Sequence, residues 1–370
     1  MSVGVRVIEE PRVRQTLFTR NGLADRVYRA AEFLQEPFYF FCNGIIGRLK
    51  TVLTPGQFGN YENPSLEKIR RLFLFCISPA VGLVALPCAI LTVPLNFLAD
   101  TILGNQPYLR LPGMYRGEKK ETFATFNMST LLPPMTLIDG VEDSDKRRKA
   151  IAEMLRDFHF VCGQEVNGSS ARFFADELRS DFREFYTYLG KSNTPLLSSG
   201  LFFAAKEKVR NVFVVPFEGS TQKAIKRLLV IFELENFSVA TTHLDGGQQN
   251  PIHLQEIQQI KTFLSQVQKP VILCGDFNED RYSNSEAYKV LTGSFVDCIA
   301  DAGGRVETCT DALKIDRFAE QVSPTELSID YATYNRNQSA LRVEFVGLEK
   351  RFEVSDHCLV KCKILLKNTS

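Results

Sequence analysis

The sequence predicts a layered α/β domain that follows a hydrophobic, helical N-terminal region. From Glu121 onward, short apolar segments alternate with amphipathic ones, a pattern typical of strands and helices packed in layers. Before that point, the segment from Leu72 to Ala99 carries no charged residue. The chain has 370 residues, which is enough for one large domain with additional segments or for two domains. We therefore expect a membrane-associated region over residues 1–110 and an α/β domain over residues 118–368.

The overall composition argues against some partners and compartments. A net charge of +1 provides no general attraction for nucleic acid, so no nucleic-acid partner is expected. The nine cysteines lack metal-type spacing, and we interpret them as mostly reduced, buried thiols, which favours a reducing compartment. The first residues, Met1 to Gln15, mix charges and lack an apolar core, so the sequence predicts no cleaved secretory signal.

Two hydrophobic segments, residues 37–47 and 72–99, characterise the N-terminal region. The second is long enough to span a bilayer, whose core takes roughly 20 apolar residues as a helix. Its prolines, Pro79, Pro87 and Pro94, recur at near-helical intervals, and each should kink or break a helix. A kinked span, a hairpin that re-enters the same leaflet, or a helix lying in the interface is therefore favoured over a straight span. A buried core helix is the remaining alternative.

Residues beside these segments indicate contacts with lipid. Lys68, Arg70 and Arg71 precede the second segment, and basic residues at a membrane surface gain about 1 kcal/mol each from anionic lipid. Anionic phospholipids are therefore expected partners and candidate activators. Cysteines in or beside the segments are candidate acylation sites, although a buried free thiol is the more common state; these are Cys42, Cys76 and Cys88.

A polar connector from Gln106 to Lys120 leads into the α/β part of the chain. The strands and helices expected after it are recognised from apolar runs, turn residues and an acidic helix start. The expected strands are 122–127, 160–165, 201–205, 212–215, 228–234, 238–242 and 271–274, and the expected helices are 145–158 and 252–267.

Polar side chains end or follow many of the apolar strands. They are Asn127, Glu165, His243, Asp276, Asn278, Asp330, Asp356 and His357. In layered α/β folds the strand ends converge on one rim, where functional residues collect. Taken singly, each is more often a solvated strand end or a structural residue. Together they provide carboxylates for a hard cation, a histidine base and a carboxylate to orient it, which are the parts of a metal-dependent phosphoesterase.

Asp276 and Asn278 follow an apolar strand closely. Gly275 permits a sharp exit from strand 271–274. The two polar residues are two positions apart, so in an extended chain they would face the same way. This arrangement would place an acid and an amide at the mouth of a sheet, which suits the binding and protonation of a phosphate ester. A strand followed by an Asp-Asn turn is the alternative interpretation.

The polar residues belong to short motifs that occur in a fixed order. These are Asn127, Gln164-Glu165, Thr242-His243, Gly275-Asp276-Phe277-Asn278, Ile329-Asp330-Tyr331 and Ser355-Asp356-His357. The series resembles the endonuclease/exonuclease/phosphatase superfamily across residues 121–365. The layout before it is similar to the membrane-associated neutral sphingomyelinases of type 2. That layout consists of two hydrophobic segments, a connector with Gln106-Pro107-Tyr108-Leu109, and then Phe123 to Asn127 and Leu131-Leu132-Pro133.

The resemblance implies a fold and an activity. The fold would be a four-layer sandwich of two mixed β-sheets flanked by helices, with residues 118–368 as the catalytic domain. The activity would be hydrolysis of sphingomyelin to ceramide and phosphocholine at a sphingomyelin-containing membrane. The cofactor would be Mg²⁺, with Mn²⁺ as the alternative.

The resemblance also implies roles for the metal and base residues. Glu165 would be the principal metal ligand, with Asn127 and Asp356 beside it. His357 would accept the proton of the attacking water while Asp330 orients its imidazole.

The other motif residues would act on the substrate. Asp276 would assist proton transfer at the leaving alkoxide of ceramide. Asn278 and His243 would contact phosphate oxygens and stabilise the added charge. Lys226 occupies the place of a lysine found in this type of sphingomyelinase, and would bind substrate.

Departures from the family pattern leave alternatives open. Ser198 stands where the family often has Asn, Asp245 follows His243 closely, and Arg227 replaces a glycine. A phosphoinositide phosphatase or a DNA repair endonuclease would share the fold, although a nuclease should carry a basic stripe. A catalytically inactive membrane adaptor is an alternative of another class, and the retained core motif residues argue against it.

Overall fold

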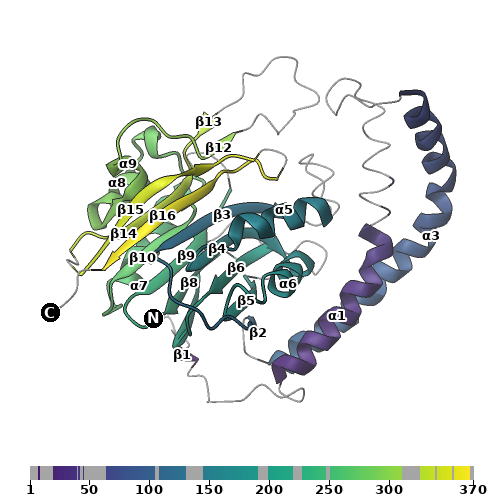
Figure 1. The fold of residues 1–370 in the computed structure, drawn as a ribbon, viewed down its shortest axis with the longest axis horizontal. Helices are drawn as coiled ribbons and strands as arrows, with labels where there is room; N and C mark the ends of the chain where they lie inside the picture. Colours follow the sequence, from purple (N-terminus) through teal and green to yellow (C-terminus); the bar gives the residue numbers. More distant parts are fainter. Residues whose placement is uncertain are drawn as a thin grey trace.

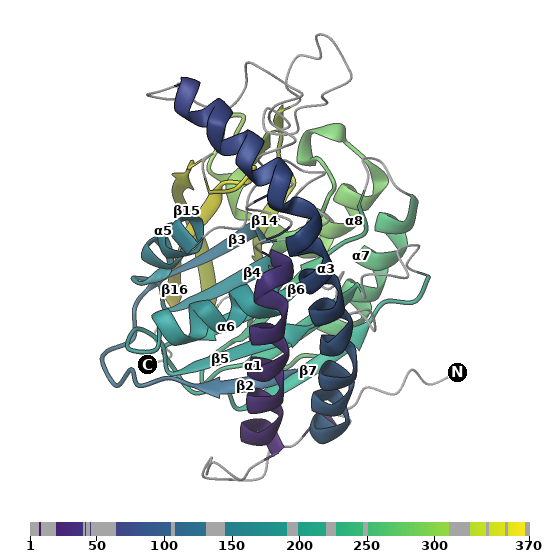
Figure 2. The same cartoon turned by 90° about the vertical axis from the view of Figure 1, so that its right-hand side faces the viewer.

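The computed structural model shows a layered α/β domain with two long helices along one side (Figures 1 and 2). The structure describes residues 7–8, 20–39, 41, 45, 64–104, 108–130, 145–190, 199–219, 227–246, 251–310, 326–337, 340–351 and 354–366.

The first sheet has seven strands and is mixed. Their spatial order is β1 (Val7–Ile8), β7 (Asn211–Pro216), β8 (Leu228–Glu233), β9 (Ser238–His243), β10 (Val271–Asp276), β14 (Asp330–Asn335) and β11 (Phe295–Asp297). Strand β10 lies inside the sheet, parallel to β9 and antiparallel to β14. The end of β10, the end of β9 and the start of β14 therefore share one edge.

The second sheet also has seven strands and is mixed. Their order is β15 (Leu341–Glu349), β16 (Leu359–Leu366), β3 (Thr122–Thr130), β4 (Phe160–Asn167), β6 (Ser199–Ala205), β5 (Glu184–Leu189) and β2 (Leu109–Pro112). Strands β3 and β4 are parallel, so that their ends meet at one edge. A separate two-stranded sheet pairs β12 (Cys309–Thr310) with β13 (Glu326–Leu327).

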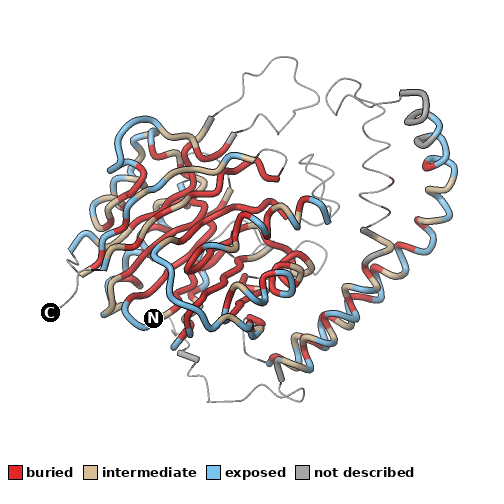
Figure 3. The backbone as a smooth tube through the Cα atoms, in the orientation of Figure 1, coloured by how far each residue is buried: buried red, intermediate tan, exposed pale blue. Residues whose placement is uncertain are grey.

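The two large sheets pack face to face around an apolar core. Phe203 on β6 and Phe232 on β8 stack across the interface with ring centroids 3.8 Å apart. Helices α5 (Asp145–Leu155) and α6 (Gly168–Glu177) pack on the second sheet. Helices α7 (Pro251–Leu264) and α8 (Glu286–Ser294) pack on the first. The predicted four-layer sandwich is confirmed. Figure 3 shows that most residues in its central strands are buried. Two short helices complete the domain, the 3-10 helix η3 (Arg281–Ser283) and α9 (Cys298–Asp301).

The predicted polar connector is wrong at Leu109–Pro112, which form β2 at the edge of the second sheet. The segment is short and contains an arginine and a proline, so it lacks a strand-like pattern. An edge strand pairs on one side alone and can therefore tolerate proline. Residues on the N-terminal side of the predicted boundary thus supply strands to both sheets, and the division into 1–110 and 118–368 stays a prediction.

The apolar segment 72–99 lies within one continuous helix, α3 (Pro64–Leu103), so of the three arrangements expected from the sequence a hairpin within this segment is not formed. Its three prolines are all exposed, and the helix curves toward the α/β domain (Figure 1). Proline kinks that recur on one side of a helix bend it in one direction, so the helix curves without ending.

Helix α3 is apolar and largely exposed. Its segment Leu72–Leu103 is long and apolar enough to cross a membrane, by length and composition, and its most apolar window has a mean hydropathy of 2.3. Only 22% of its most apolar window is buried, which disfavours the buried core helix considered from the sequence. Exposed apolar side chains on it include Phe73, Leu83 and Phe97.

Helix α1 (Arg20–Tyr39) contacts α3 on one side. Ala24 and Tyr28 cluster with Ala99 and Leu103 near the end of α3. The Tyr28 hydroxyl also donates a hydrogen bond to the Asp100 carboxylate. The start of α1 therefore lies beside the end of α3, and the two helices are antiparallel.

Helix α1 is also attached to the α/β domain, by charged and aromatic contacts. Arg29 pairs with Asp176 on α6 at 2.9 Å, and Glu32 pairs with Arg172 on α6 at 2.7 Å. The ring of Tyr28 stacks on Tyr188 of β5, with ring centroids 4.4 Å apart. Helix α1 thus connects α3 to the second sheet.

Candidate active site

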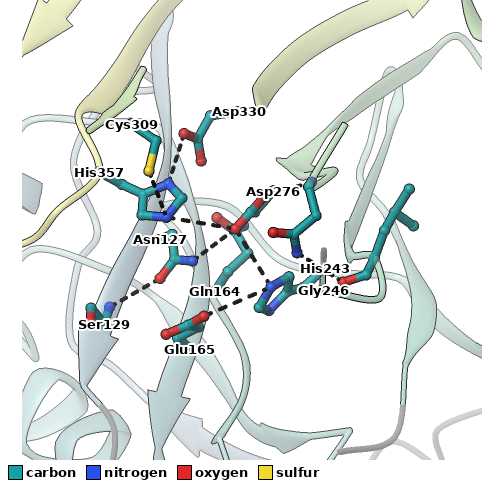
Figure 4. Close-up of polar contacts among 12 residues, drawn as sticks. Asn127, Ser129, Gln164, Glu165, His243, Gly246, Asp276, Cys309, Asp330 and His357 are labelled. Atoms are coloured by element: carbon teal, nitrogen blue, oxygen red, sulfur yellow. Dashed lines mark hydrogen bonds and ion pairs between the residues drawn. The ribbon is translucent and has the colours of Figure 1, made fainter. Parts of the chain in front are cut away.

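Strand ends from both sheets meet at one rim, and Figure 4 shows the polar side chains gathered there. Pairing in the first sheet places Asp276 opposite His243 on β9 and opposite Asp330 on β14. From the second sheet, Asn127 on β3 donates from Nδ2 to Asp276 Oδ2 at 2.8 Å. This hydrogen bond joins the two sheets at the centre of the rim.

Gly275 fixes the position of Asp276. The glycine has φ of +148°, and a Cβ built on it would lie 2.0 Å from the Thr242 carbonyl oxygen. Any side chain here would therefore push β10 away from β9. The close approach of the two strands sets Asp276 within 3.5 Å of His243 Nε2.

His357 and Asp330 form a buried pair. His357 Nδ1 lies 2.9 Å from Asp330 Oδ2, and both side chains are almost fully buried. Burial acts to lower the pKa of His357, but the charge of Asp330, together with interactions from Cys309, raises that pKa well above its ordinary value. The contact with Asp330 assigns a proton to Nδ1 and directs Nε2 into the site, where it lies 3.8 Å from Asp276 Oδ2.

Glu165 lies at the end of β4 in a strained backbone conformation. Its φ is +53°, and the pairing of β4 with both neighbours shifts register around it. A positive φ in a residue other than glycine is uncommon and is often found at functional sites. Here it separates Glu165 from the regular alternation of β4.

The Glu165 carboxylate is close to a second carboxylate. Burial and the charge of Asp356 raise the pKa of Glu165 to about 7. Two neighbouring carboxylates that repel one another, one buried (Asp356) and one half-buried (Glu165), are a characteristic binding site for a cation. Asp356 also belongs to a group with Cys309 and His357 whose ligand atoms lie within 4.8 Å of one another, and Asp276, Asp330 and His357 form a similar group.

His243 is neutral in this environment. Burial and the nearby Arg227 guanidinium lower the pKa of His243 to about 3. Its Nε2 lies 3.8 Å from Glu165 Oε1. Arg227 is itself buried, and its charge acts on both Glu165 and Asp276. The site therefore contains a buried guanidinium.

Asn278 lies beside Asp276, but the predicted extended chain between them is not formed. Asn278 has φ of +50°, so the chain after Asp276 turns and does not continue as an extended strand. Its backbone N–H donates to Asp276 Oδ1 at 2.9 Å, and its Nδ2 donates to the Leu244 carbonyl at 3.1 Å. The alternative Asp-Asn turn is what forms, and it still keeps Asn278 beside Asp276.

A network of buried hydrogen bonds holds Asp245, two residues after His243. The Asp245 N–H donates to Glu256 Oε2 at 3.0 Å, and the Asp245 carbonyl lies 2.7 Å from His253 Nε2. His253 Nδ1 lies 2.8 Å from Glu279 Oε2. The acidic residue that departs from the family pattern therefore belongs to a buried network that fixes this segment.

Two residues at the site were not predicted as functional from the sequence. Cys309 lies with its Sγ 3.5 Å from His357 Nε2, and the sequence indicates Arg227 only as a departure from the family pattern. Neither residue belongs to a sequence motif. Each is brought to the site by contacts with residues that are distant in the sequence. The predicted substrate residue Lys226, immediately before Arg227, lies outside the described residues.

Comparisons with known proteins agree with the fold. The model of the endonuclease/exonuclease/phosphatase family matches residues 124–357. No curated protein matches the sequence. Among solved structures, SmcL is 14% identical with a TM-score of 0.51, covering 65% of this chain and 98% of SmcL.

Two further solved structures give similar values. Beta toxin from Staphylococcus aureus is 13% identical with a TM-score of 0.50, covering 67% of this chain and 100% of the toxin. An endonuclease/exonuclease/phosphatase protein from Bacteroides vulgatus is 15% identical with a TM-score of 0.50, covering 68% of this chain and 100% of that chain. At such identities, these likenesses show a shared fold.

Proposed function

Because this chain belongs to the endonuclease/exonuclease/phosphatase family, whose members are metal-dependent hydrolases of phosphoric esters, we propose that it hydrolyses sphingomyelin to ceramide and phosphocholine. The observation that best supports a hydrolase is the buried His357–Asp330 pair, in which the second ring nitrogen, Nε2, lies 3.8 Å from the Asp276 carboxylate. Sphingomyelin is favoured by the motif layout shared with the membrane-associated neutral sphingomyelinases. The exposed apolar surface of α3 supports action at a membrane.

The residues present fit a hard divalent cation. Glu165 and Asp356 offer carboxylate oxygens, and Asn127 lies beside them with an amide. Burial and repulsion from Asp356 raise the pKa of Glu165, and a divalent cation would offset that repulsion. Mg²⁺ prefers a few carboxylates together with water and phosphate oxygens, so we propose Mg²⁺, with Mn²⁺ as the alternative. When bound, such an ion would polarise the phosphate and neutralise developing negative charge.

His357 would act as the base. Its Nε2 would take a proton from the attacking water, and Asp330 would stabilise the imidazolium through Nδ1. In the metal-free protein, the carboxylate of Asp330 favours the protonated form of His357. Positive charge at Glu165 and Asp356 would favour the neutral form, so the base would be available when the cation is bound.

Asp276 would transfer a proton to the leaving group, although it is ionised before the reaction. Burial acts to raise the pKa of Asp276, but His243 and His357, with a hydrogen bond from Asn127, lower it overall. The group is therefore ionised, and it would pass to the ceramide alkoxide the proton that His357 takes from the attacking water, since His357 Nε2 lies 3.8 Å from Asp276 Oδ2. His243, being neutral, would donate a hydrogen bond to a phosphate oxygen, and the buried charge of Arg227 would attract the phosphate.

The proposal is tested by Mg²⁺-dependent release of phosphocholine from sphingomyelin vesicles. Phosphatidylcholine vesicles and phosphoinositide vesicles are run in parallel, with His357→Ala as the inactive control. Preferential release from sphingomyelin supports the proposal. Phosphate release from the phosphoinositide would favour the phosphatase instead, and a folded protein inactive on all three lipids would favour the membrane adaptor.

A further inference from the structure

Cys309 contacts the catalytic histidine at the nitrogen that the proposed mechanism uses. Its Sγ lies 3.5 Å from His357 Nε2, and its backbone forms a β-bridge with His357. Both residues are buried. The neighbouring Thr308 hydroxyl accepts hydrogen bonds from the backbone N–H groups of Ile329 and Asp330 at 3.1 and 3.0 Å. The same short segment therefore holds Cys309 against His357 and fixes the strand that carries Asp330.

Three different ligand types converge at this point. The Cys309 sulfur, a ring nitrogen of His357 and a carboxylate oxygen of Asp356 all lie within 4.8 Å of one another. Sulfur, imidazole and carboxylate together are the donor set of zinc sites, whereas Mg²⁺ avoids sulfur. An open zinc site has three protein ligands and leaves its fourth position to water or substrate.

The distances fit a tetrahedral ion. With Zn–S near 2.3 Å and Zn–N near 2.05 Å, a tetrahedral angle separates sulfur from nitrogen by about 3.6 Å. The observed separation between Cys309 Sγ and His357 Nε2 is 3.5 Å. Zinc-bound histidines commonly donate their other N–H to a carboxylate, which fixes the tautomer. His357 has this second contact through Nδ1 and Asp330, at 2.9 Å.

We propose that Cys309, Asp356 and His357 form a binding site for a thiophilic divalent cation of the Zn²⁺ type, and that the bound ion inhibits hydrolysis. Binding forms a sulfur–metal bond and a nitrogen–metal bond, and it releases both the Cys309 thiol proton and the His357 Nε2 proton to solvent, with no change in oxidation state. The lone pair on His357 Nε2 is then held by the metal and cannot accept a proton from water. Asp356 is drawn away from the hard-cation site at the same time. The inhibitory part of this inference rests on the proposed function, whereas metal binding does not.

Metal binding is tested with Co²⁺ alone as a spectroscopic probe on the full chain. We expect near-ultraviolet thiolate-to-cobalt absorption that saturates at one ion per chain. Cys309→Ser should abolish it, and Cys76→Ser, which changes an exposed cysteine on α3, should retain it. If Cys309→Ser fails to fold, Asp356→Asn serves instead and should weaken Co²⁺ binding about tenfold or more. Absorption that persists in Cys309→Ser, or its absence in the unmodified chain, would overturn the site.

Inhibition is tested separately with Zn²⁺ against Mg²⁺-supported hydrolysis of the lipid that the chain cleaves, normalised to the Zn²⁺-free rate of each variant. The Zn²⁺ concentration for half inhibition should rise at least about tenfold in Cys309→Ser, because one of three ligands is weakened. Equal sensitivity in both proteins would refute inhibition through this site. If the chain gives the cobalt signal but hydrolyses no lipid, the proposed metal site is supported and the proposed function is refuted.

Discussion

The His357–Asp330 pair provides the most direct test of the proposed chemistry. Changing Asp330 to Asn keeps the size of the side chain and an oxygen that can accept from His357 Nδ1, while it removes the charge. Because Asp330 is the main group that raises the pKa of His357 against burial, the variant should contain a weaker base. General-base catalysis contributes roughly 10²–10⁴ in rate, so His357→Ala should lose an amount in that range.

The double variant distinguishes a coupled pair from two independent residues. If His357→Ala costs about 10³ and Asp330→Asn about 10², independent losses would multiply to about 10⁵. A coupled pair predicts about 10³ for the double variant, because Asp330 acts only through His357. The two expectations differ by about a hundredfold, which is readily measured as kcat/KM at saturating Mg²⁺.

A matched control is available elsewhere in the same fold. His159 Nε2 lies 3.0 Å from Glu207 Oε1 in another buried histidine–carboxylate pair, just before β4 begins. His159→Ala should lower stability by about 1–3 kcal/mol through loss of its hydrogen bond to the charged Glu207, which keeps its ion pair with Lys119, without a large change in kcat/KM. Losses that simply multiply at Asp330 and His357, or near-normal turnover in His357→Ala, would refute the assignment of His357 as the base.

Three further predictions concern the metal, the buried network and the N-terminal helices. Glu165→Gln should reduce activity at least about a hundredfold with little rescue by added Mg²⁺; unchanged Mg²⁺ dependence in rate assays would rule out Glu165 as the ligand. Burial acts to lower the pKa of His253, but Glu279 and the Asp245 carbonyl raise this pKa overall. The protonated histidine therefore stabilises the fold fully below its unfolded pKa of about 6.5, and this contribution is lost as the pH rises through the folded pKa. Urea unfolding should therefore show His253→Asn closer to the unmodified chain at pH about 9 than at about 6, and an equal gap at both would contradict this. Finally, labels within residues 51–66 and 105–120 should lie on the same side of sealed vesicles, because α1 is bound both to α3 and to α6; labels on opposite sides would indicate a true span.

Much of the rim could be predicted because it depends on strand ends. Glu165, His243 and Asp276 each follow an apolar run, and parallel neighbours bring such ends together. The turn at Asn278 could not be inferred from alternation, because a left-handed φ follows from the hydrogen bond to Asp276 and not from local apolar pattern. Cys309 and Arg227 carry no periodic or motif signal, and they become visible only when distant segments are brought together.

The N-terminal elements show a different reason for error. Three prolines within an apolar run suggest that a helix is interrupted. Because all three lie on the exposed side of α3, the helix curves and does not end. Leu109–Pro112 are too few and too polar to resemble a strand, and an existing sheet edge selects their conformation. In both cases the surrounding structure decides between conformations that local propensity leaves nearly balanced.

The attachment of α1 to both α3 and α6 has a kinetic consequence on a lipid surface. The ion pairs from Arg29 and Glu32 hold the catalytic domain at a fixed height and tilt relative to α3, unlike a flexible tether. With α3 lying in the surface of a bilayer, each new substrate would arrive by lateral diffusion to an active site held at one distance from that surface. We expect turnover to follow the mole fraction of substrate in the surface and not the bulk lipid concentration. Because two charged pairs maintain that alignment and the Arg29–Asp176 pair is exposed, added salt should reduce processive turnover before it unfolds the domain.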